Sequence, residues 1–243
     1  MSQPVGVVSQ LRRHPVKSMV GEVLETVRVD ERGVVGDRVW AVYTDDGRIG
    51  SGKDSRRFRR VDGLLQLQAT LDGDRPGGRP QVHLPDGRVL DVGDPATDAV
   101  LSEVLGRRVA LRAEAGVSHF DDSPLHLVTT TGLTSLAREL GGPVQVDRFR
   151  PNLVVDTLAA GLLDGYPDDG WTGRRLAVGA EVVVEVEIGM PRCVMVDAEQ
   201  RGLPGGGAVL KTLGRVHDVE FGMQVSVVGT GTIRCGDEVH LLP

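Results

Sequence analysis

The chain has 243 residues, and 40% of them are hydrophobic, which provides for a globular core and argues against a disordered chain. A net charge of −6 and only 3% aromatic residues do not suit a protein that binds duplexes or stacks nucleobases, so we expect no nucleic-acid partner. Two cysteines are too few for a disulfide framework or a four-thiolate iron–sulfur cluster.

The first half of the chain predicts short strands separated by turns. Asp94 is suited to cap a helix that Pro95 opens and Gly106 ends. Strands at this spacing, with turn signals between them, favour a barrel or a sandwich. The predicted strands are runs rich in Val and Leu at residues 6–11, 23–29, 39–43, 65–71 and 81–84.

The second half predicts two more helices, near residues 131–140 and over 208–213, among further strands. The strands are predicted at 152–155, 182–188, 223–228, 230–234 and 238–242. A compositional seam at 113–121 indicates a boundary, so we expect one lobe over residues 1–115 and a second over 116–243. The expected fold class is mostly β and rich in barrel strands, with a few short helices and two closely packed lobes.

Cys193 is the strongest candidate for a reactive or metal-binding side chain. It follows the strongest predicted strand, which Pro191 breaks, and Arg192 stands beside it. A neighbouring guanidinium favours the thiolate, which is the form that ligates soft metals. The alternative is that Cys193 is a small buried apolar residue, as free cysteines usually are. The local sequence leaves both interpretations open.

Cys235 is interpreted as structural, because its strand-then-turn context recruits no other reactive group. No signal-like segment precedes the first predicted strand, and no apolar run approaches the roughly 20 residues that cross a bilayer. We therefore expect a cytoplasmic protein with no membrane partner and no disulfide between Cys193 and Cys235.

Several cations stand at predicted strand ends. Lys17 with Ser18 offers a point charge and a hydroxyl for a phosphate, and Arg38 stands beside Asp37, with which it could also form a purely structural pair. Arg150 and Asn152 flank Pro151, so on an extended backbone they face the same side. An anion site and a solvated surface are both compatible with this pattern. The same holds for the basic cluster of Lys53, Arg56, Arg57, Arg59 and Arg60.

Taken in order, six segments resemble the MOSC family, named for the C-terminal domain of molybdenum-cofactor sulfurase. The resemblance extends over nearly the whole chain and is greatest to members with an N-terminal β-barrel lobe, which include the amidoxime-reducing components. The segments are Pro15-Val16-Lys17-Ser18, Gly36-Asp37-Arg38-Val39-Trp40, Ser123-Pro124-Leu125-His126-Leu127, Phe149-Arg150-Pro151-Asn152, Arg192-Cys193 with Val196-Asp197, and Gly236-Asp237-Glu238-Val239.

The resemblance implies a molybdenum–molybdopterin cofactor held between the lobes. By motif, Cys193 ligates the metal and Arg192 lies beside it, which makes these two the candidate catalytic residues. Contacts to the pterin and its phosphate are implied for Lys17, Ser18, Arg38, Arg150 and Asn152, with a looser alignment adding Thr129 and Thr130. The cofactor's chemistry agrees, because cations and an amide suit its phosphate and heterocycle, and a thiolate suits its metal.

Two functions from different classes follow from this resemblance. The first is a molybdenum-dependent oxidoreductase that reduces N-hydroxylated small molecules with electrons from an external redox protein or reductase. The second is a carrier of the cofactor, or of sulfur as a persulfide on Cys193. A third alternative is a barrel that has lost its cofactor. All cofactor hypotheses require that the Cys193 sulfur face a cleft shared with Lys17, Arg38 and Arg150.

Overall fold

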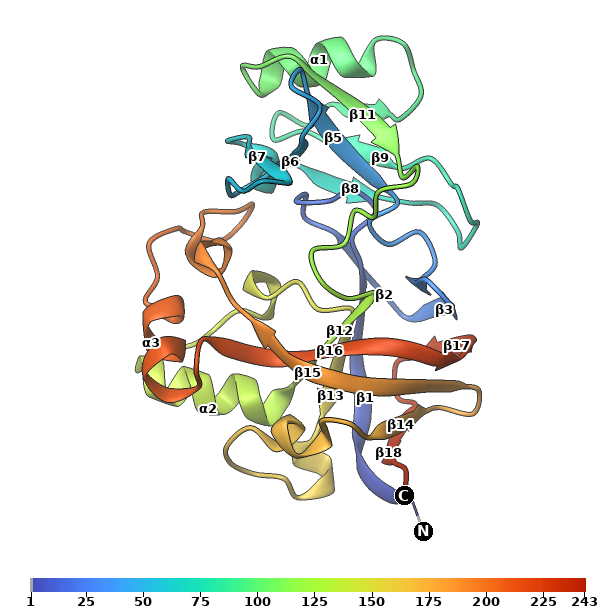
Figure 1. The fold of residues 1–243 in the computed structure, drawn as a ribbon, viewed down its shortest axis with the longest axis vertical. Helices are drawn as coiled ribbons and strands as arrows, with labels where there is room; N and C mark the ends of the chain where they lie inside the picture. The colour runs from blue at the N-terminus through green and yellow to red at the C-terminus, as the bar shows by residue number, and fades with distance from the viewer. Residues whose placement is uncertain (1) are drawn as a thin grey trace.

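Seven strands close into a barrel in the lower half of Figure 1, within the part of the chain that the computed structural model describes, residues 2–243. They lie in the order β13-β12-β16-β15-β14-β18-β1, and pairing between β1 and β13 closes the ring, while β2 (Glu22–Leu24) pairs with β1 outside it. The barrel strands are β1 (Gln3–Arg13), β12 (Leu125–Thr129), β13 (Leu153–Asp156), β14 (Arg175–Val178), β15 (Val182–Pro191), β16 (Glu220–Gly229) and β18 (Glu238–Leu241).

Alternating aliphatic residues fill the barrel. In β15, Val182, Val184 and Val186 are buried while the residues between them are partly exposed, as expected for a strand with one face on the core. Leu127 of β12 and Val225 of β16 are fully buried in the same cluster. Only β12 and β13 pair in parallel, whereas the other barrel pairs are antiparallel. The core therefore consists mainly of Val and Leu, in keeping with the low aromatic content.

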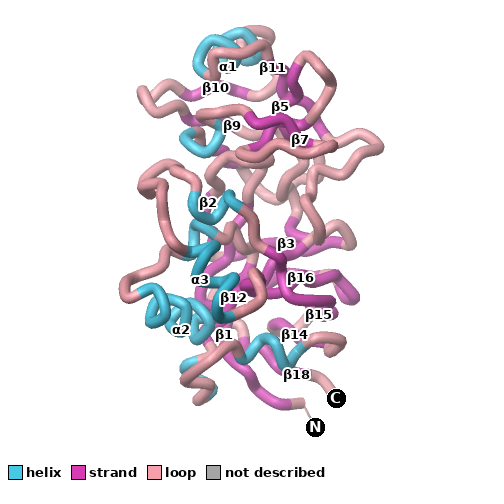
Figure 2. Tube along the Cα trace, turned by 60° about the vertical axis from the view of Figure 1, so that its left-hand side comes forward, coloured by secondary structure: helices cyan, strands magenta, loops and turns pink. Residues whose placement is uncertain are grey.

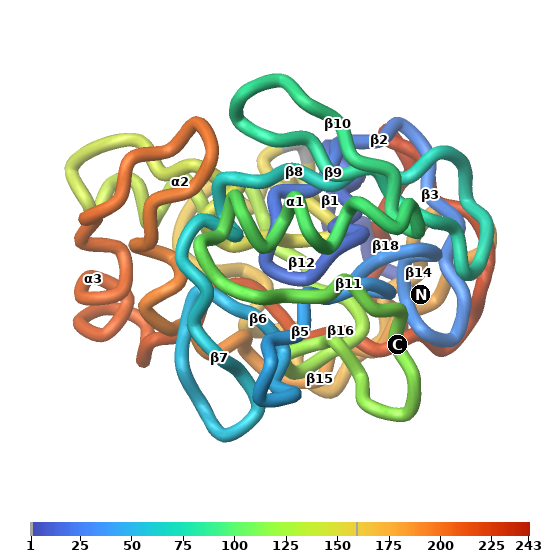
Figure 3. Tube along the Cα trace, turned by 90° about the horizontal axis from the view of Figure 1, so that it is seen from above, coloured from blue at the N-terminus to red at the C-terminus, as the bar shows by residue number. Residues whose placement is uncertain are grey.

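Two helices cover one side of the barrel, as Figure 3 shows from above. The N-cap of helix α2 (Thr130–Leu140) is Thr129, whose hydroxyl accepts a hydrogen bond from the Gly132 amide, and its C-cap is Gly141 with φ 71°. The helix α3 (Val209–Val216) packs beside α2. Both helices bury their apolar residues against aromatic side chains, including Phe221 of β16. This outer layer explains why all five residues of β12 are buried.

The second lobe consists of two small sheets and the helix α1 (Thr97–Val104), seen at the top of Figures 1 and 2. One sheet has the order β11-β5-β6-β7, and the other β10-β9-β8. The strands are β5 (Trp40–Thr44), β6 (Ile49–Ser51), β7 (Phe58–Arg60), β8 (Gln68–Thr70), β9 (Gln81–His83), β10 (Val89–Asp91) and β11 (Val109–Ala113). Their core centres on Val42, Leu64, Leu84 and Leu101.

A third small sheet, β17-β3-β4, flanks the barrel, and the described part of the chain has five 3-10 helices in its connections. Its strands are β3 (Thr26–Asp30), β4 (Gly33–Val34) and β17 (Gly231–Arg234). The 3-10 helices are η1 (Leu64–Gln66), η2 (Val146–Arg148), η3 (Leu158–Ala160), η4 (Pro167–Trp171) and η5 (Val194–Asp197). Among residues 2–243, no helix is both long and apolar enough to cross a membrane.

The mostly β fold with two packed lobes is confirmed. The boundary at residue 115 stays a prediction, and in space apolar residues of β1 to β4 pack into the barrel core together with those of β12 to β18. Two local predictions were wrong. Residues 65–71 form part of η1 followed by β8, and Ala96 rather than Asp94 is the N-cap residue of α1. Asp94 instead accepts the Ala96 amide in a turn before the helix.

Candidate functional site

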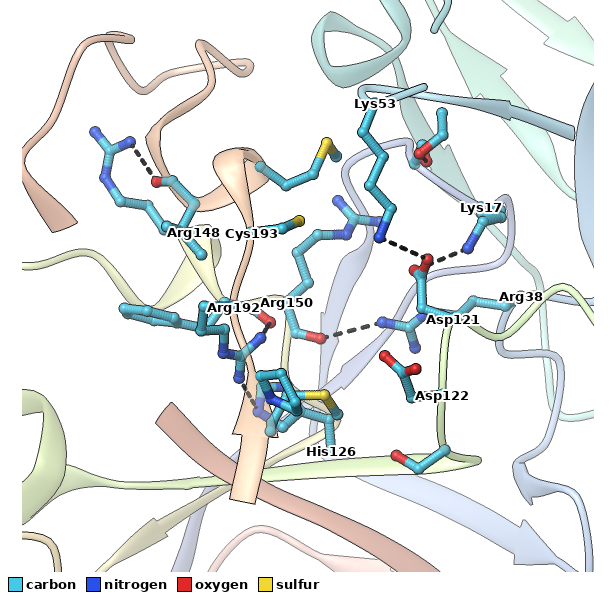
Figure 4. A pocket seen from close by; sticks show the side chains of 18 of the residues that line it. Lys17, Arg38, Lys53, Asp121, Asp122, His126, Arg148, Arg150, Arg192 and Cys193 are labelled. Carbon is cyan, nitrogen blue, oxygen red and sulfur yellow. Dashed lines mark hydrogen bonds and ion pairs between the residues drawn. The ribbon is translucent and has the colours of Figure 1, made fainter. Parts of the chain in front are cut away.

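A cavity of about 110 Å³ lies where the barrel and the upper lobe meet. Six cationic side chains and two carboxylates line it, so the cavity is locally positive in a chain whose net charge is −6. Strand ends and loops from both lobes supply the lining, as Figure 4 shows. The cations are Lys17, Arg38, Lys53, Arg148, Arg150 and Arg192, and the acids are Asp121 and Asp122.

Cys193 lines this cavity two residues after the end of β15 at Pro191. It is half-buried, and its extended backbone leads into η5 (Val194–Asp197). The Arg192 amide donates to the Val219 carbonyl over 2.8 Å, which fixes the chain just before the cysteine. The sulfur therefore faces the same cavity as Lys17, Arg38 and Arg150, as the cofactor hypotheses require.

Arg192 is turned toward the protein interior. Its guanidinium donates to the carbonyls of Phe149 and Phe221 and contacts Nε2 of His126. Burial lowers the pKa of Arg192 to about 9, with the Cys193 sulfur as the main opposing influence, and it lowers the pKa of His126 well below its usual value. A neutral His126 can accept a hydrogen bond from the guanidinium. In this arrangement Arg192 positions the turn that carries Cys193.

Lys17 is almost completely buried, and its ammonium donates to Oδ2 of Asp121 over 2.8 Å. Lys53 approaches the other oxygen of the same carboxylate to 3.4 Å. Burial lowers the pKa of Lys17 to about 8 even though Asp121 opposes the change. The pKa of Asp121 is lowered to about 2, because Lys17 and Lys53 together outweigh the opposing effect of burial. A carboxylate of the chain thus occupies the position that a phosphate would need beside Lys17.

Three of the predicted site residues have left-handed backbones. Ser18, Arg38 and Arg150 have φ values of 64°, 52° and 54°, in a region of backbone conformation that residues other than glycine rarely adopt. Such strain persists where the surrounding structure imposes it, and it concentrates at functional sites. Arg38 pairs with Asp37 as expected, yet it also lines the cavity and donates to the Arg150 carbonyl over 3.2 Å. The premise of an extended backbone at Arg150 was wrong.

Asn152 lines the cavity, but its side-chain amide forms hydrogen bonds with main-chain groups. Its amide nitrogen donates to the Arg12 carbonyl, and its oxygen accepts the His126 amide, both over 3.2 Å. Ser18 lies nearby, with its hydroxyl 3.4 Å from that of Ser51. Lys17, Ser18, Arg38, Arg150, Asn152, Arg192 and Cys193 are thus brought together at one cavity.

Thr129 and Thr130 do not line the cavity. The Thr129 hydroxyl caps α2 and donates to Asp168 over 2.8 Å, and the Thr130 hydroxyl donates to Asp156 over 3.0 Å. These hydroxyls are engaged at the helix N-terminus, where backbone amides lack partners within the helix. The structure therefore lends no support to cofactor contacts from these two threonines.

Sequence reasoning missed several residues of the cavity, including Ser51, Asp121 and Asp122, and considered Arg148 only as the neighbour of Arg150 before the predicted strand. The only sequence signal for Asp121 and Asp122 was that they immediately precede the segment that begins at Ser123. Lys53 belonged to a basic cluster whose remaining arginines mostly pair with neighbouring acids or carbonyls. Cys235 lies apart from the cavity, against the barrel core, with its sulfur 3.6 Å from the Leu24 carbonyl. Both cysteines are free.

The chain is similar to known proteins over nearly its whole length. Mitochondrial amidoxime reducing component 2 of Rattus norvegicus is 27% identical over 297 residues, covering 98% of this chain and 84% of the relative. Molybdenum cofactor sulfurase of Drosophila grimshawi is 25% identical over 277 residues, covering 96% of this chain but 34% of that protein. Among solved structures, the YuaD protein from Bacillus subtilis covers all of both chains with a TM-score of 0.51 at 14% identity, which supports the fold alone.

Two family descriptions together span almost the whole chain. The MOSC N-terminal beta barrel domain matches residues 5–107, and the MOSC domain matches residues 107–240. The second match alone covers more than half of the chain. Residues from both matched regions line the cavity, for example Lys17 and Cys193. This protein therefore belongs to the MOSC domain family.

Proposed function

We propose that the cavity binds a molybdenum–pterin cofactor with Cys193 as the thiolate ligand of the metal, and that the protein is an oxidoreductase for N-hydroxylated small molecules. The observation that carries this proposal is the position of the Cys193 sulfur in the same cavity as Lys17, Arg38 and Arg150. The likeness to the amidoxime reducing components supports the choice of reaction.

The side chains present suit such a group chemically. A thiolate is a ligand of soft metals, and ammonium and guanidinium groups bind phosphate. Cys193 is half-buried, so its sulfur is accessible from the cavity without being freely exposed to solvent. When bound, the cofactor supplies two-electron redox chemistry for removing an oxygen atom from the substrate. The protein supplies orientation and charge.

Each cavity residue has a role in this proposal. Lys17 and Arg38 bind the phosphate, for which Lys17 exchanges or shares its contact with Asp121. Arg150, whose guanidinium donates to the Met19 carbonyl over 2.6 Å, adds positive charge for the anionic cofactor, and Arg192 holds the turn that presents Cys193. Electrons come from a separate redox protein or reductase. The cytoplasmic location stays a prediction.

Elemental analysis tests the metal site after expression in a host that makes the cofactor. The wild type is expected to contain molybdenum close to one atom per chain, and Cys193→Ala is expected to lose most of it. Cys235→Ala is the matched control, because Cys235 is also half-buried but lies against the barrel core. Equal molybdenum in the wild type and in Cys193→Ala would remove the ligand assignment.

The reaction is tested separately with a chemical reductant and an amidoxime. Molybdenum-loaded wild type is expected to form the amidine, whereas Cys193→Ala is not. Mass spectrometry of the freshly purified protein distinguishes the carrier alternative. A stable sulfur adduct on Cys193 in protein without molybdenum would favour a sulfur carrier over the reductase.

A further inference from the structure

The turn that joins α3 to β16 holds the residue next to Cys193 in place. This α3–β16 turn, residues 217–221, lies beside the end of β15 (Figure 1). Its Val219 carbonyl accepts the Arg192 amide over 2.8 Å, and its Phe221 carbonyl accepts Nε of the same arginine over 2.9 Å. The turn therefore supplies two of the main-chain acceptors that fix Arg192.

The backbone of the α3–β16 turn is strained. Asp218 and Val219 have φ values of 47° and 65°, in the left-handed region that residues other than glycine rarely adopt, and a β-branched residue such as valine least of all. The Val219 amide donates to the Leu213 carbonyl over 3.2 Å, and the Glu220 amide donates to the His217 carbonyl over 2.8 Å. Such a conformation persists only where surrounding contacts impose it.

The His217 side chain ties this turn to the 3-10 helix η4. Its Nδ1 lies 2.8 Å from the Glu220 carbonyl oxygen within the turn, and its Nε2 lies 2.8 Å from Oδ2 of Asp169 in η4. The imidazole ring also stacks on the ring of Tyr166, with the centroids 3.9 Å apart. One side chain thus contacts both the strained turn and the element beside it.

The positions of these two oxygen atoms require a protonated ring. A neutral imidazole has one N–H donor and one acceptor nitrogen, whereas the imidazolium donates from both nitrogens. A main-chain carbonyl and an ionised carboxylate can only accept, so both contacts form together only when His217 carries the charge. Burial opposes that charge, but the hydrogen bonds to Asp169 and to the Glu220 carbonyl outweigh it and raise the pKa of His217.

The other charged and titratable groups around the ring are mostly acidic. Burial raises the pKa of Asp168 to about 6, and once ionised this carboxylate favours the charged form of His217. Burial also raises the pKa of the Tyr166 hydroxyl, which therefore stays neutral. The groups that surround the ring are Asp168, Asp169 and Tyr166 from η4 and the residue before it, Asp218 and Glu220 in the turn, and the ion pair of Glu139 in α2 with Arg215 in α3, 3.1 Å long.

We propose that His217, as an imidazolium, is a positioning residue for Cys193. It holds the α3–β16 turn against η4, and the turn holds Arg192 and with it the segment that presents the sulfur to the cavity. Loss of the proton leaves one ring nitrogen facing an oxygen that cannot donate. The turn is then released from η4, and the Cys193 segment loosens. This inference goes beyond the proposed function, because it holds whatever the cavity binds.

Hydrogen exchange of the Arg192 amide in the full-length protein measures the hold directly. Wild type and His217→Gln are compared at the same pH, so that the intrinsic pH dependence of exchange cancels in the ratio of their rates. Because folding raises the pKa of His217, the contact is fully formed below its ordinary value and is lost as the pH rises through the folded-state value. Near pH 6 the variant is expected to exchange about fivefold faster, whereas near pH 9 the ratio should fall to about one.

The rate at which a neutral reagent alkylates Cys193 tests the link to the sulfur. Cys235 is the internal reference, because it is also half-buried but lies against the barrel core. Near pH 6, His217→Gln is expected to label Cys193 about fivefold faster than the wild type does, relative to Cys235. Near pH 9 the two proteins should label alike. Faster exchange at Arg192 with unchanged labelling of Cys193 would overturn the positioning role, because the turn would then move without the sulfur.

Two further variants keep the result interpretable. Asp169→Asn removes the charge at an exposed position but keeps an oxygen for Nε2, so it tests the proposal even if His217→Gln fails to fold. It is expected to shift the acceleration of exchange to a lower pH. His240→Gln is the matched control, because Nε2 of His240 also lies 2.9 Å from a carboxylate, that of Glu238, but on β18, which pairs with neither β15 nor β16. It is expected to exchange at the wild-type rate at both pH values.

The outcomes separate this role from simple packing and from the proposed function. Equal exchange in wild type and His217→Gln near pH 6 would overturn the proposal. The same ratio at both pH values would also overturn it, because the ring would then act through its shape rather than its charge. An unshifted pH dependence in Asp169→Asn would do so too. Wild type without molybdenum would overturn the proposed function and leave this inference standing.

Discussion

Replacing Asp121 with Asn tests the ion pair at the centre of the cavity. The asparagine keeps an oxygen that can accept the Lys17 hydrogen bond, now 2.8 Å long, but removes the charge. Lys17 then remains buried with its carboxylate partner gone, while cations such as Arg38 and Lys53 still oppose its charge. We expect the variant to be less stable than the wild type at neutral pH.

The size of the loss follows from the Asp121 pKa. A fall from an ordinary value near 3.9 to about 2 corresponds to about 2.5 kcal/mol of folding free energy. The Asp121 side chain is 44% exposed, so solvent screening reduces this to about 1 kcal/mol. Lys17 limits the loss further, since its pKa of about 8 allows it to lose its proton once the carboxylate is gone. We therefore expect a loss of about 1 kcal/mol at pH 7.

The pH dependence gives this prediction its sign. Because the folded-state pKa of Asp121 is depressed, its stabilisation is present above pH 4 and is lost as the pH falls toward 2. On the alkaline side the pair weakens as Lys17 loses its proton near pH 8. The stability difference between wild type and Asp121→Asn should thus be largest between about pH 5 and 7.

Urea denaturation across this pH range measures the difference. Asp122→Asn is the matched control, because Asp122 lines the same cavity and loses the same charge but is not paired with Lys17. It should change the free energy of unfolding by less than about 0.5 kcal/mol. If both variants lose the same amount, or if the Asp121 effect does not depend on pH, the ion pair is not what stabilises this site.

Three other substitutions test the fold. Leu127→Ala, at a fully buried barrel position, should lower the free energy of unfolding by about 2–5 kcal/mol in urea denaturation. Val23→Ala, at a position that is 60% exposed, should change it by less than about 0.5 kcal/mol. A loss under about 1 kcal/mol for Leu127→Ala would contradict the tight packing of Leu127 in the barrel core. Gly222→Ala should destabilise the protein more than Gly47→Ala. Both glycines have positive φ, but only at Gly222 would the new Cβ lie 2.5 Å from the Leu127 carbonyl oxygen. Equal losses of stability would show that the barrel backbone shifts to accommodate the new Cβ. Burial raises the pKa of Asp168 to about 6, so ionisation of Asp168 should lower the stability of the wild type as the pH rises from 4 to 6. Asp168→Asn should therefore be about 2 kcal/mol more stable than the wild type at pH 7 but not at pH 4. The same gain at both pH values would refute this reasoning.

Local signals in the sequence predicted the features that depend on neighbouring residues. The alternation of Val182, Val184 and Val186 predicted β15, and Gly141 predicted the end of α2. The proline after β15 placed Cys193 at a strand end. Cations at strand ends were found for the same reason, because strand and turn preferences are properties of a few consecutive residues.

Features that depend on distant partners were not predictable in this way. The pairing of Val8 with Val155 closes the barrel, and no local pattern specifies it. The resemblance alone suggested a cofactor contact for Thr129, and only the fold shows that its hydroxyl caps α2. The left-handed backbones of Arg38 and Arg150 run against the preferences of their residue type. The surrounding barrel and loops impose them.

The position of β1 in the barrel has a consequence for how the protein folds. Its hydrogen-bonding partners within the barrel are β13 and β18, which are synthesised long after β1 itself. The sheets of the upper lobe pair strands that are closer in sequence, so this lobe is free to fold during translation. Val5, Val8 and Leu11 of β1 stay unburied until the later barrel strands are synthesised. Closing such long loops is entropically costly and slows folding. Ring closure is therefore expected to be the last and slowest step, and the nascent chain would need protection from aggregation until β18 arrives.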